Sequence, residues 1–416
     1  MIGFDLNRIF EFMLGYRENV SDLNFSVGRS PQVEVDGSLI SVPIKGVEKL
    51  SPFQTEIIAL TLMGQDQEIT RKLITSGSTD LSYALPGVTR FRVNIFQQRG
   101  TLGVVMRVIP SAVPSIESLS LPKALYQVAE EKTGIVLVTG PTGSGKSTTL
   151  ATVINEINQK HAYHIVTIED PIEYMHMHRQ STINQRELGS DTTTFAMALR
   201  AALRQAPKVI LVGEMRDQET TEIALEAAET GHLVLSTLHT IDASKTIDRI
   251  IGIFPKSDEQ QIRIRFAQSF KWVISQRLIP KQKGGRLAIF EILKSTQRTR
   301  EYVVKGELEG RSLLDAMNDG SLEGMQTFDR ELEKAVRKGI LNEQVALSYA
   351  TNAGNLKLQL EGLSTEEGMD MGSLMDREGA PSIPTAKTEP IPAPRTERKS
   401  DVKPKPRETK LPDWME

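Results

Sequence analysis

Residues 140–147 read Gly140-Pro141-Thr142-Gly143-Ser144-Gly145-Lys146-Ser147, and Thr148 follows them. This run satisfies the pattern G-x-x-x-x-G-K-[ST]. It follows the short apolar run 135–139 and precedes a segment in which Leu150, Val153, Ile154 and Ile157 recur at the spacing of one helix face. A glycine-rich loop between a buried strand and an amphipathic helix is the setting that this pattern requires. The sequence therefore predicts an α/β protein that binds a nucleoside triphosphate.

The residue types of this loop fit the chemistry of phosphate binding. Glycines allow consecutive backbone N–H groups to turn toward a phosphate, and the helix N-terminus adds a partial positive charge. Lys146 is expected to reach the β- and γ-phosphates, and the Ser147 hydroxyl to bind Mg²⁺. A chance glycine-rich turn would not explain the strand and the helix on either side. We therefore predict that residues 140–148 bind ATP or GTP together with Mg²⁺.

Bulk composition excludes several classes of protein. The 416 residues carry 25% charged and 39% hydrophobic residues, with a net charge of -3, so no global positive field attracts nucleic acid or anionic lipid. Cysteine is absent, which excludes disulfides and thiolate-bound metals. The start of the chain does not resemble a signal peptide, and no run approaches the ~18 apolar residues of a membrane span. We expect a cytosolic protein that meets the membrane only through partners.

Composition also divides the chain into five regions. The first mixes a short amphipathic helix with alternating, strand-like runs, and a proline-containing linker follows it. The third alternates apolar strands with helices, as a parallel α/β sheet requires, and the fourth is expected to be helical. The last is rich in proline and charge and poor in apolar side chains, so we expect it to be disordered. The five regions are 1–108, 109–120, 121–290, 291–362 and 363–416.

A carboxylate follows the apolar run 209–212, about 70 residues after the phosphate loop. This residue is Glu214. Catalytic groups of open α/β sheets lie at the carboxyl ends of strands, so Glu214 is expected to face the γ-phosphate as a catalytic base. Gly213 occupies the place where an aspartate that binds Mg²⁺ is usual. Alternatively, Glu214 only begins a capped helix.

The segment Ile168-Glu169-Asp170-Pro171-Ile172-Glu173 offers further carboxylates after another strand-like run. Three acids within five positions repel one another, which is reasonable beside a cation. Glu169 is the best second carboxylate, either for Mg²⁺ or for the attacking water. A solvated acidic turn is the other interpretation of the same residues.

Two histidines, His232 and His239, flank the apolar run 233–235. An imidazole at the end of a strand could sense or stabilise phosphate charge, so both are predicted site residues. Each could also be an ordinary core histidine. A metal site at His176 and His178 is not favoured, because no third ligand is evident.

Together these segments resemble the PilT/PilU family of pilus-retraction ATPases, within the secretion-ATPase superfamily. The resemblance covers about residues 1–360 and includes an opening motif at 21–23, the phosphate loop, an acidic box at 166–173, an atypical Walker B segment at 209–217 and a histidine box at 231–240. It implies a PAS-like α+β N-terminal domain on a RecA-like P-loop ATPase core, assembled as a homo-hexamer. It also implies catalytic roles for Glu214, Glu169, His232 and His239, and phosphate contacts by Arg92 and Arg107 of the N-terminal domain.

The function implied by this resemblance is ATP hydrolysis that drives type IV pilus retraction. The expected partners are a pilus inner-membrane platform protein and a paralogous retraction ATPase, at the inner face of the cell membrane at the pilus base. The ending 352–358 is more similar to the PilU branch. An assembly or secretion ATPase of the same superfamily is the main alternative, although those proteins typically carry a four-cysteine zinc element. A nucleic-acid translocase is disfavoured by the 5% aromatic content and the negative charge. A regulatory nucleotide switch stays a third alternative.

Overall fold

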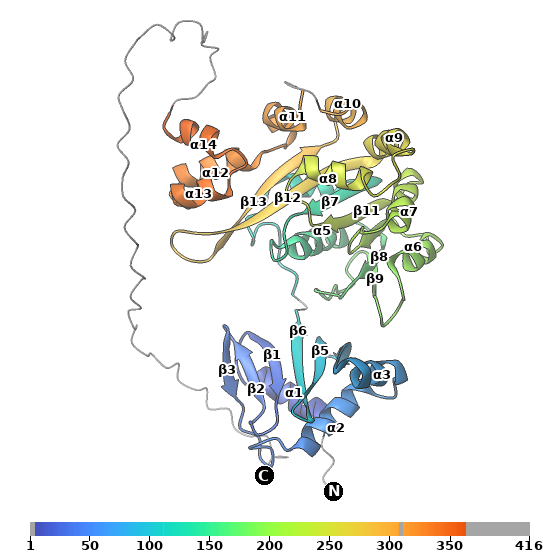
Figure 1. Cartoon of the computed structure of the whole chain (residues 1–416), viewed down its shortest axis with the longest axis vertical. Coiled ribbons are helices and arrows are strands. Elements are labelled where there is room, and N and C mark those ends of the chain that lie inside the picture. Colours follow the sequence, from blue (N-terminus) through green and yellow to red (C-terminus); the bar gives the residue numbers. More distant parts are fainter. Residues whose placement is uncertain (1–4, 111, 308–310, 363–416) are drawn as a thin grey trace, which may run out of the picture.

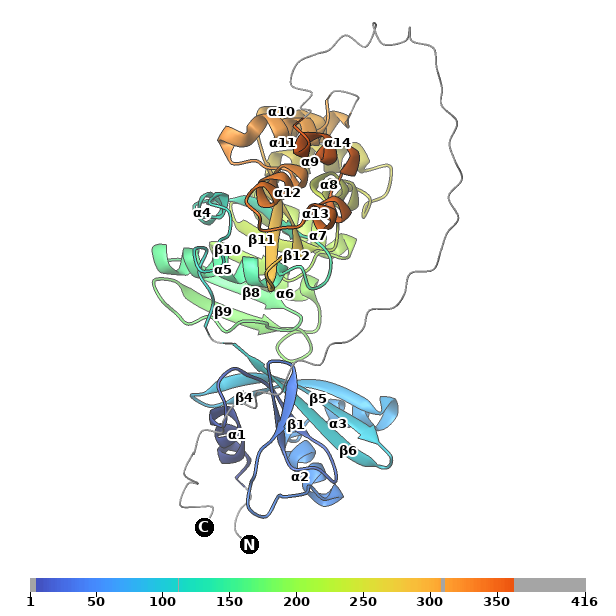
Figure 2. The same ribbon diagram turned by 90° about the vertical axis from the view of Figure 1, so that its left-hand side faces the viewer.

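The computed structural model describes residues 5–110, 112–307 and 311–362. They form an N-terminal α+β domain, a larger α/β core and a group of C-terminal helices. Figure 1 shows the N-terminal domain, in blue, below the core, with helices α12–α14 beside the long β12–β13 hairpin. Figure 2 shows the same order after a quarter turn. The predicted α/β class with a smaller N-terminal domain is confirmed.

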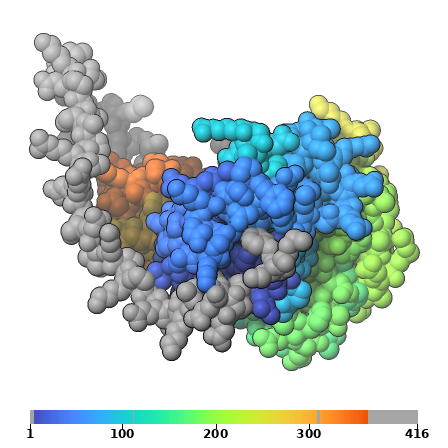
Figure 3. All heavy atoms as spheres, turned by 90° about the horizontal axis from the view of Figure 1, so that it is seen from below, coloured from blue at the N-terminus to red at the C-terminus, as the bar shows by residue number. Residues whose placement is uncertain are grey.

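The N-terminal domain is a six-stranded antiparallel sheet, in the order β3-β2-β1-β6-β5-β4. Three helices cover it, and their aromatic and aliphatic side chains form one core with Phe10, Phe25 and Phe91 near its centre. Figure 3 looks onto this domain from below, with the green part of the core beyond it. Its elements are α1 (Leu6–Gly15), β1 (Val20–Phe25), β2 (Gln32–Val35), β3 (Ser38–Ser41), α2 (Pro52–Met63), α3 (Gln67–Ser76), β4 (Ser78–Leu85), β5 (Thr89–Gln98) and β6 (Thr101–Ile109).

The core is built on a seven-stranded sheet in the order β13-β12-β7-β11-β10-β8-β9, parallel except for the β12–β13 hairpin. Because its central strands are buried on both faces, they are continuous apolar runs rather than alternating ones. The elements from α4 to β13 are α4 (Ala124–Ala129), β7 (Gly134–Thr139), α5 (Lys146–Lys160), β8 (His164–Glu169), β9 (Thr182–Glu187), α6 (Phe195–Leu203), β10 (Val209–Val212), α7 (Gln218–Glu229), β11 (Leu233–Leu238), α8 (Ala243–Ile251), α9 (Glu259–Ser269), β12 (Phe270–Pro280) and β13 (Arg286–Lys294).

Successive side chains of these strands serve two separate cores. In β7, Ile135 and Leu137 pack against helices α6–α9 on one face of the sheet. Val136 and Val138, between them in sequence, pack against α4 and α5 on the other face. The alternation follows from strand geometry, in which neighbouring side chains point to opposite faces. Burial on both sides fixes the sheet and therefore the loops at its ends.

The C-terminal region is helical, but the sheet continues further into the chain than predicted. Strand β13 extends to Lys294, past the expected boundary at residue 290, because its residues complete the ladder with β12. The helical part contains α10 (Gln297–Lys305), α11 (Leu313–Asp319), the short 3₁₀ helix η1 (Gly320–Glu323), α12 (Phe328–Arg337), α13 (Glu343–Tyr349) and α14 (Ala353–Leu360). The predicted tail 363–416 lies outside the described residues. Among the residues that the structure does describe, none of the helices is both long and apolar enough to cross a membrane.

Two charged side chains of the hairpin make contacts with distant parts of the chain, Arg277 with the C-terminal helices and Glu291 with helix α8 of the core. Arg277 of β12 donates a hydrogen bond to the carbonyl of Tyr349, and its guanidinium lies 3.7 Å from the centre of the Phe328 ring. Glu291 of β13 is 2% exposed and accepts a hydrogen bond of 2.9 Å from the backbone N–H of Ala243. Burial raises the pKa of Glu291 to about 7. The contact between the hairpin and α8 therefore contains a buried carboxyl group with a raised pKa.

Replacing Glu291 by glutamine is predicted to remove a pH-dependent loss of stability. The pKa of Glu291 is about 7 in the folded chain and near 4.5 without burial. The folded state therefore holds a proton that the unfolded state releases, and the free energy of unfolding falls as the pH rises from 4.5 through 7. The full effect is about 3 kcal/mol. Thermal unfolding at pH 5 and pH 8 should show Glu291→Gln gaining in Tm over the wild type as the pH rises. A pH-independent difference, as expected for the exposed Glu323→Gln, would contradict this.

Candidate nucleotide-binding and hydrolysis site

Four loops that the sequence marks as functional leave the sheet at one edge. The phosphate loop follows β7, Glu169 ends β8, Gly213 and Glu214 follow β10, and His239 follows β11. The strands are parallel and in register, with Leu238 opposite Thr139 and Val212 opposite both Ile168 and Ser236. All four loops therefore meet at the carboxyl ends of the strands, where open α/β sheets bind ligands.

These loops enclose a cavity of about 560 Å³. Its lining combines the phosphate loop, both predicted carboxylates and two histidines, His176 and His239, with residues from the β12–β13 hairpin. Most of its surroundings come from the core, and none of its lining residues belongs to the N-terminal domain. The polar lining residues that matter for phosphate chemistry are Lys146, Ser147, Glu169, Glu173, Glu214, Arg216, His239 and Arg286.

Lys146 begins helix α5 and is held against the loop that precedes it. Its ammonium group donates hydrogen bonds of 2.9 Å to the carbonyl of Gly140 and 3.2 Å to that of Pro141. Burial lowers the pKa of Lys146, while the nearby carboxylates of Glu214 and Glu173 act in the opposite direction. A cation that is only 8% exposed and bonded only to neutral carbonyls is poised to exchange these for phosphate oxygens.

The phosphate loop is supported from below by strand β12. The side-chain amide of Gln276 donates a 2.6 Å hydrogen bond to the Ser144 carbonyl and accepts one of 2.8 Å from the Thr149 hydroxyl. Gln276 is 3% exposed. Its contacts span the loop and the first turn of α5. This strand was not expected to contribute to the site, because no local motif marks it.

Gly140 has no room for a side chain. Its φ is +142°, and an added Cβ would overlap the Gln276 carbonyl oxygen and lie 2.8 Å from the Ser144 hydroxyl. Gly140→Ala is therefore expected to strain the backbone and displace the loop, at a cost of about 2–4 kcal/mol. Nucleotide affinity should fall about a hundredfold in a fluorescent-nucleotide titration. The matched control is Gly354→Ala in α14, where an added Cβ would lie at an ordinary contact distance, 3.6 Å, from the Asn352 side chain, and this variant should bind normally. Equal nucleotide affinity in the two variants would contradict this steric role of Gly140.

Glu214 lies within reach of an arginine and a histidine. Its carboxylate is 2.7 Å from the Arg216 guanidinium and 3.4 Å from His239 Nε2, and its side chain is 15% exposed. The hydrogen bond with Glu214 raises the pKa of Arg216. The structure thus brings Glu214 and His239 together at the mouth of the cavity, as the sequence predicts. Arg216 was missed, although it lies only two positions after Glu214.

Close steric contacts explain why residue 213 is glycine and not aspartate. A Cβ on Gly213 would lie 3.2 Å from the carbonyl oxygen of Ile168 and 3.4 Å from the Cα of Glu169. An aspartate there would push into the neighbouring strand. Glu169, at the end of that strand, lines the same cavity and supplies a carboxylate from the adjacent position.

Glu169 is held firmly by neutral partners. It accepts hydrogen bonds of 2.6 Å from the Thr167 hydroxyl and 3.1 Å from the Gln185 side-chain amide. Burial raises its pKa to about 7, against the effect of these two donors. A half-buried carboxylate whose hydrogen-bond partners are all neutral is a favourable place for a divalent cation. Ser147 and Glu169 line one cavity and offer the oxygen ligands that Mg²⁺ prefers.

His232 is not part of this cavity. It precedes β11, at the opposite edge of the sheet, where its carbonyl accepts a hydrogen bond from Gly134. Its ring nitrogen Nδ1 lies 2.9 Å from the carbonyl of Ala227 at the end of α7. The length of β11, six residues or about 20 Å, separates it from His239. The prediction that both histidines serve one phosphate site is therefore wrong within a single chain. Because His232 and His239 flank the same strand, they lie at its opposite ends.

Arg92 and Arg107 also lie away from the cavity. They are opposite each other on β5 and β6, both exposed, and Arg107 donates a 3.0 Å hydrogen bond to Asp22. The expected phosphate contacts are not made within one chain. Arg286, at the start of β13, lines the cavity instead. Only the folding of the hairpin brings it there, so no sequence motif could have identified it.

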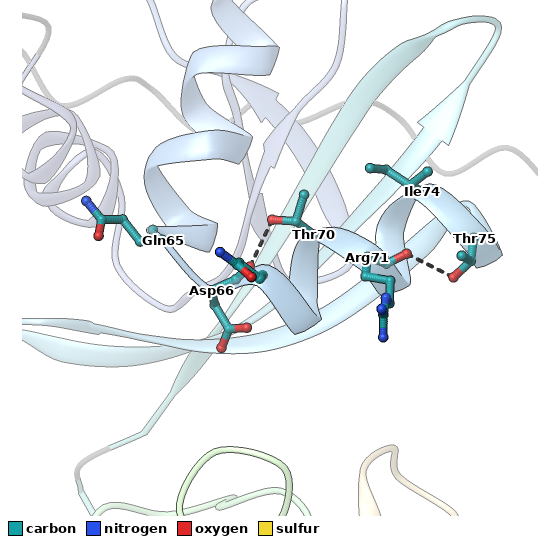
Figure 4. Close-up of a pocket in the computed structure, with 8 residues that line it drawn as sticks. Gln65, Asp66, Thr70, Arg71, Ile74 and Thr75 are labelled. Atoms are coloured by element: carbon teal, nitrogen blue, oxygen red, sulfur yellow. Dashed lines mark hydrogen bonds between the residues drawn. The ribbon is translucent and has the colours of Figure 1, made fainter.

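A second cavity, of about 370 Å³, lies in the N-terminal domain and is lined by the turn between α2 and α3 and by α3 itself. Figure 4 shows its lining residues, where Thr70 and Thr75 donate hydrogen bonds of 2.9 Å to carbonyls of their own helix. The side chains drawn there bring together no pair of catalytic groups. Of these two cavities, the one at the carboxyl ends of the core strands is the candidate site.

The chain is similar to known proteins over most of its length. A family model described as type II/IV secretion system protein matches residues 57–346. The type IV pilus retraction ATPase PilT of Pseudomonas aeruginosa is 42% identical over 334 residues, which are 80% of this chain and 95% of that protein. The type IV pilus ATPase PilU of the same organism is 38% identical over 351 residues, covering 84% and 90%.

A solved structure is similar over most of the chain. The crystal structure of the pilus retraction motor PilT with bound ADP is 41% identical in sequence, with a TM-score of 0.75. The similarity covers 85% of this chain and 98% of that one. Only a small part of that chain has no counterpart here.

Proposed function

We propose that this chain is an ATP-driven motor that retracts type IV pili. The chain belongs to the type II/IV secretion system protein family and to its PilT/PilU branch of retraction ATPases. The observation that carries the proposal is the meeting of Lys146, Glu169 and Glu214 in one cavity. Nearly full coverage of the retraction relative supports the same conclusion, because the whole motor and not only its nucleotide-binding half is matched.

The residues of the cavity have separate tasks in ATP hydrolysis. Backbone N–H groups of the phosphate loop and the Lys146 ammonium hold the triphosphate. Glu214 orients the attacking water and accepts its proton, while Arg216 and His239 hold its carboxylate in place. Ser147 and Glu169 would hold Mg²⁺, which when bound neutralises charge on the phosphates. Water under the control of Glu214 then attacks the γ-phosphate.

We further propose that six copies form a ring in which Arg92 and Arg107 reach the site of an adjacent subunit. Both arginines are exposed and absent from the cavity of their own chain, which supports a contact between subunits. The ring acts at the cytoplasmic face of the membrane, on a platform protein embedded there and beside a paralogous retraction ATPase.

Deleting the gene tests retraction against assembly. If the motor retracts pili, the deletion strain should carry more surface pili than the wild type and should not move by twitching. Pilus counts by electron microscopy, together with motility imaging, measure both. Bald cells would instead indicate an assembly ATPase, the alternative within the same superfamily.

A further inference from the structure

Strand β9 lies where the core meets the N-terminal domain. It is the last strand of the core sheet, next to β8, and in Figures 1 and 2 alike it lies on the side of the core that faces the blue domain. Glu169 and Glu187 are opposite each other in this pairing. Two side chains of β9, Gln185 and Glu187, hold the loop that carries the catalytic carboxylate. We call residues 169–176 the acidic loop.

Gln185 binds the acidic loop at three points. Its amide nitrogen donates hydrogen bonds of 3.1 Å to the Glu169 carboxylate and 2.8 Å to the carbonyl of Tyr174. Its amide oxygen accepts a 2.8 Å hydrogen bond from the backbone N–H of His176. One side chain therefore joins both ends of the loop to β9. The position of Glu169 depends on where Gln185 lies.

Glu187 binds the same loop and also the other domain. Its carboxylate accepts a 3.3 Å hydrogen bond from the backbone N–H of Ile172, in the middle of the loop. It also accepts a hydrogen bond from the hydroxyl of Ser82 on β4 and lies 3.6 Å from the guanidinium of Arg90 on β5. The Glu187 side chain is only 7% exposed. A single buried carboxylate thus bridges the N-terminal domain and the acidic loop.

The burial of Glu187 makes this bridge sensitive to domain position. A buried carboxylate is costly unless hydrogen bonds and an opposite charge satisfy it. Ser82 and Arg90 supply these from the N-terminal domain, and Ile172 supplies one from the core. If the N-terminal domain moves away, Glu187 must find other partners or water. The acidic loop, which donates a hydrogen bond to Glu187 through Ile172, is then no longer held in the same place.

We propose that Glu187 is a positioning residue through which the N-terminal domain sets the place of the acidic loop, and that Gln185 passes this position on to Glu169. The inference rests on the proposed function of Glu169 and Glu214 in hydrolysis. According to this proposal, the rate of hydrolysis depends on the position of the N-terminal domain, whereas nucleotide binding at the phosphate loop does not. Neither Glu187 nor Gln185 forms a hydrogen bond with the phosphate loop, and the acidic loop meets residues 140–148 through one hydrogen bond of 3.1 Å, between the hydroxyls of Tyr174 and Thr148.

The test removes the contacts of the N-terminal domain without touching the acidic loop. In the full chain, Ser82→Ala combined with Arg90→Met should speed hydrogen exchange of the backbone amides of residues 170–178. It should also lower kcat about tenfold, as loss of an outer partner of a catalytic group does. The Kd for a fluorescent ATP analogue should stay within about twofold, since Lys146 and the Ser144 carbonyl keep their own hydrogen bonds. The conservative Arg90→Lys should retain most of the wild-type kcat.

Matched controls separate this effect from a general loss of structure. Ser78→Ala makes the same change on the same strand at an exposed position, and Asn184→Ala changes an exposed residue of β9. Both should leave exchange and kcat unchanged. Gln185→Ala, made entirely within the core, should lower kcat without changing Kd even if the double variant proves unstable.

Two results would overturn the inference. One is unchanged exchange of residues 170–178 in the double variant, and the other is a fall in affinity equal to the fall in kcat. The exchange measurement needs no catalytic activity, so it tests the link even if the wild type hydrolysed no ATP. A wild type that hydrolyses no ATP would refute the proposed function, but it would not contradict the link between the N-terminal domain and the acidic loop.

Discussion

The Lys146→Ala variant is expected to bind ATP at least about a hundredfold more weakly than the wild type and to show no measurable hydrolysis. Lys146 is the one lysine that lines the cavity, and its ammonium is buried against two carbonyls of the phosphate loop. Exchange of these for phosphate oxygens makes charge-assisted hydrogen bonds worth about 1.5–3 kcal/mol each. Alanine removes them and leaves the negative charge of Glu214 and Glu173 facing the phosphates.

The control for this variant lies at the other end of the same helix. Lys160 ends α5, is exposed and forms ion pairs with Glu130 and Glu156. Lys160→Ala changes the net charge equally but should leave nucleotide binding as it is. Titration with a fluorescent ATP analogue measures both variants. Wild-type affinity in Lys146→Ala would show that the triphosphate is held elsewhere.

The Glu214→Gln variant should bind ATP normally and hydrolyse it about 10²–10⁴ times more slowly. Glutamine has nearly the same shape and can still accept a hydrogen bond from Arg216, but it cannot take a proton from water. The change should therefore appear in kcat and not in Kd. Phosphate release under saturating ATP and Mg²⁺ measures the first, and nucleotide titration measures the second.

A glutamate on the helix that follows provides the control. Glu219 lies in the first turn of α7, is exposed and pairs with Arg200. Glu219→Gln removes the same charge five residues from Glu214 and should hydrolyse ATP at the wild-type rate. Turnover by Glu214→Gln at the rate of this control would remove Glu214 from the catalytic role.

The sequence predicted those features of the site that local chemistry determines. The apolar runs around residues 135–139 and 209–212 are strands because a sheet buried on both faces needs continuous apolar residues. Lys146, Glu169 and Glu214 share a cavity because parallel strands bring their carboxyl ends to one edge. For the same reason His239 could be placed, as it follows its strand.

Other features depend on contacts between distant parts of the chain. Gln276 and Arg286 come from the β12–β13 hairpin, which reaches the phosphate loop only after the sheet has formed. The absence of an aspartate at position 213 could be seen in the sequence, but its cause, the closeness of Ile168 and Glu169, is tertiary. His232 lies away from the cavity because it precedes β11, whereas His239 follows it, and the two ends of a strand are far apart.

The most direct test of the account measures pilus shortening in cells whose only copy of the gene carries Glu214→Gln and which lack the paralogous ATPase. Fluorescently labelled pili allow extension and retraction to be followed separately. If hydrolysis under the control of Glu214 drives retraction, pili should extend at the normal rate and then fail to shorten. Pili that shorten at the wild-type rate would contradict the account, because the carboxylate at the centre of the site would not be needed for the motion.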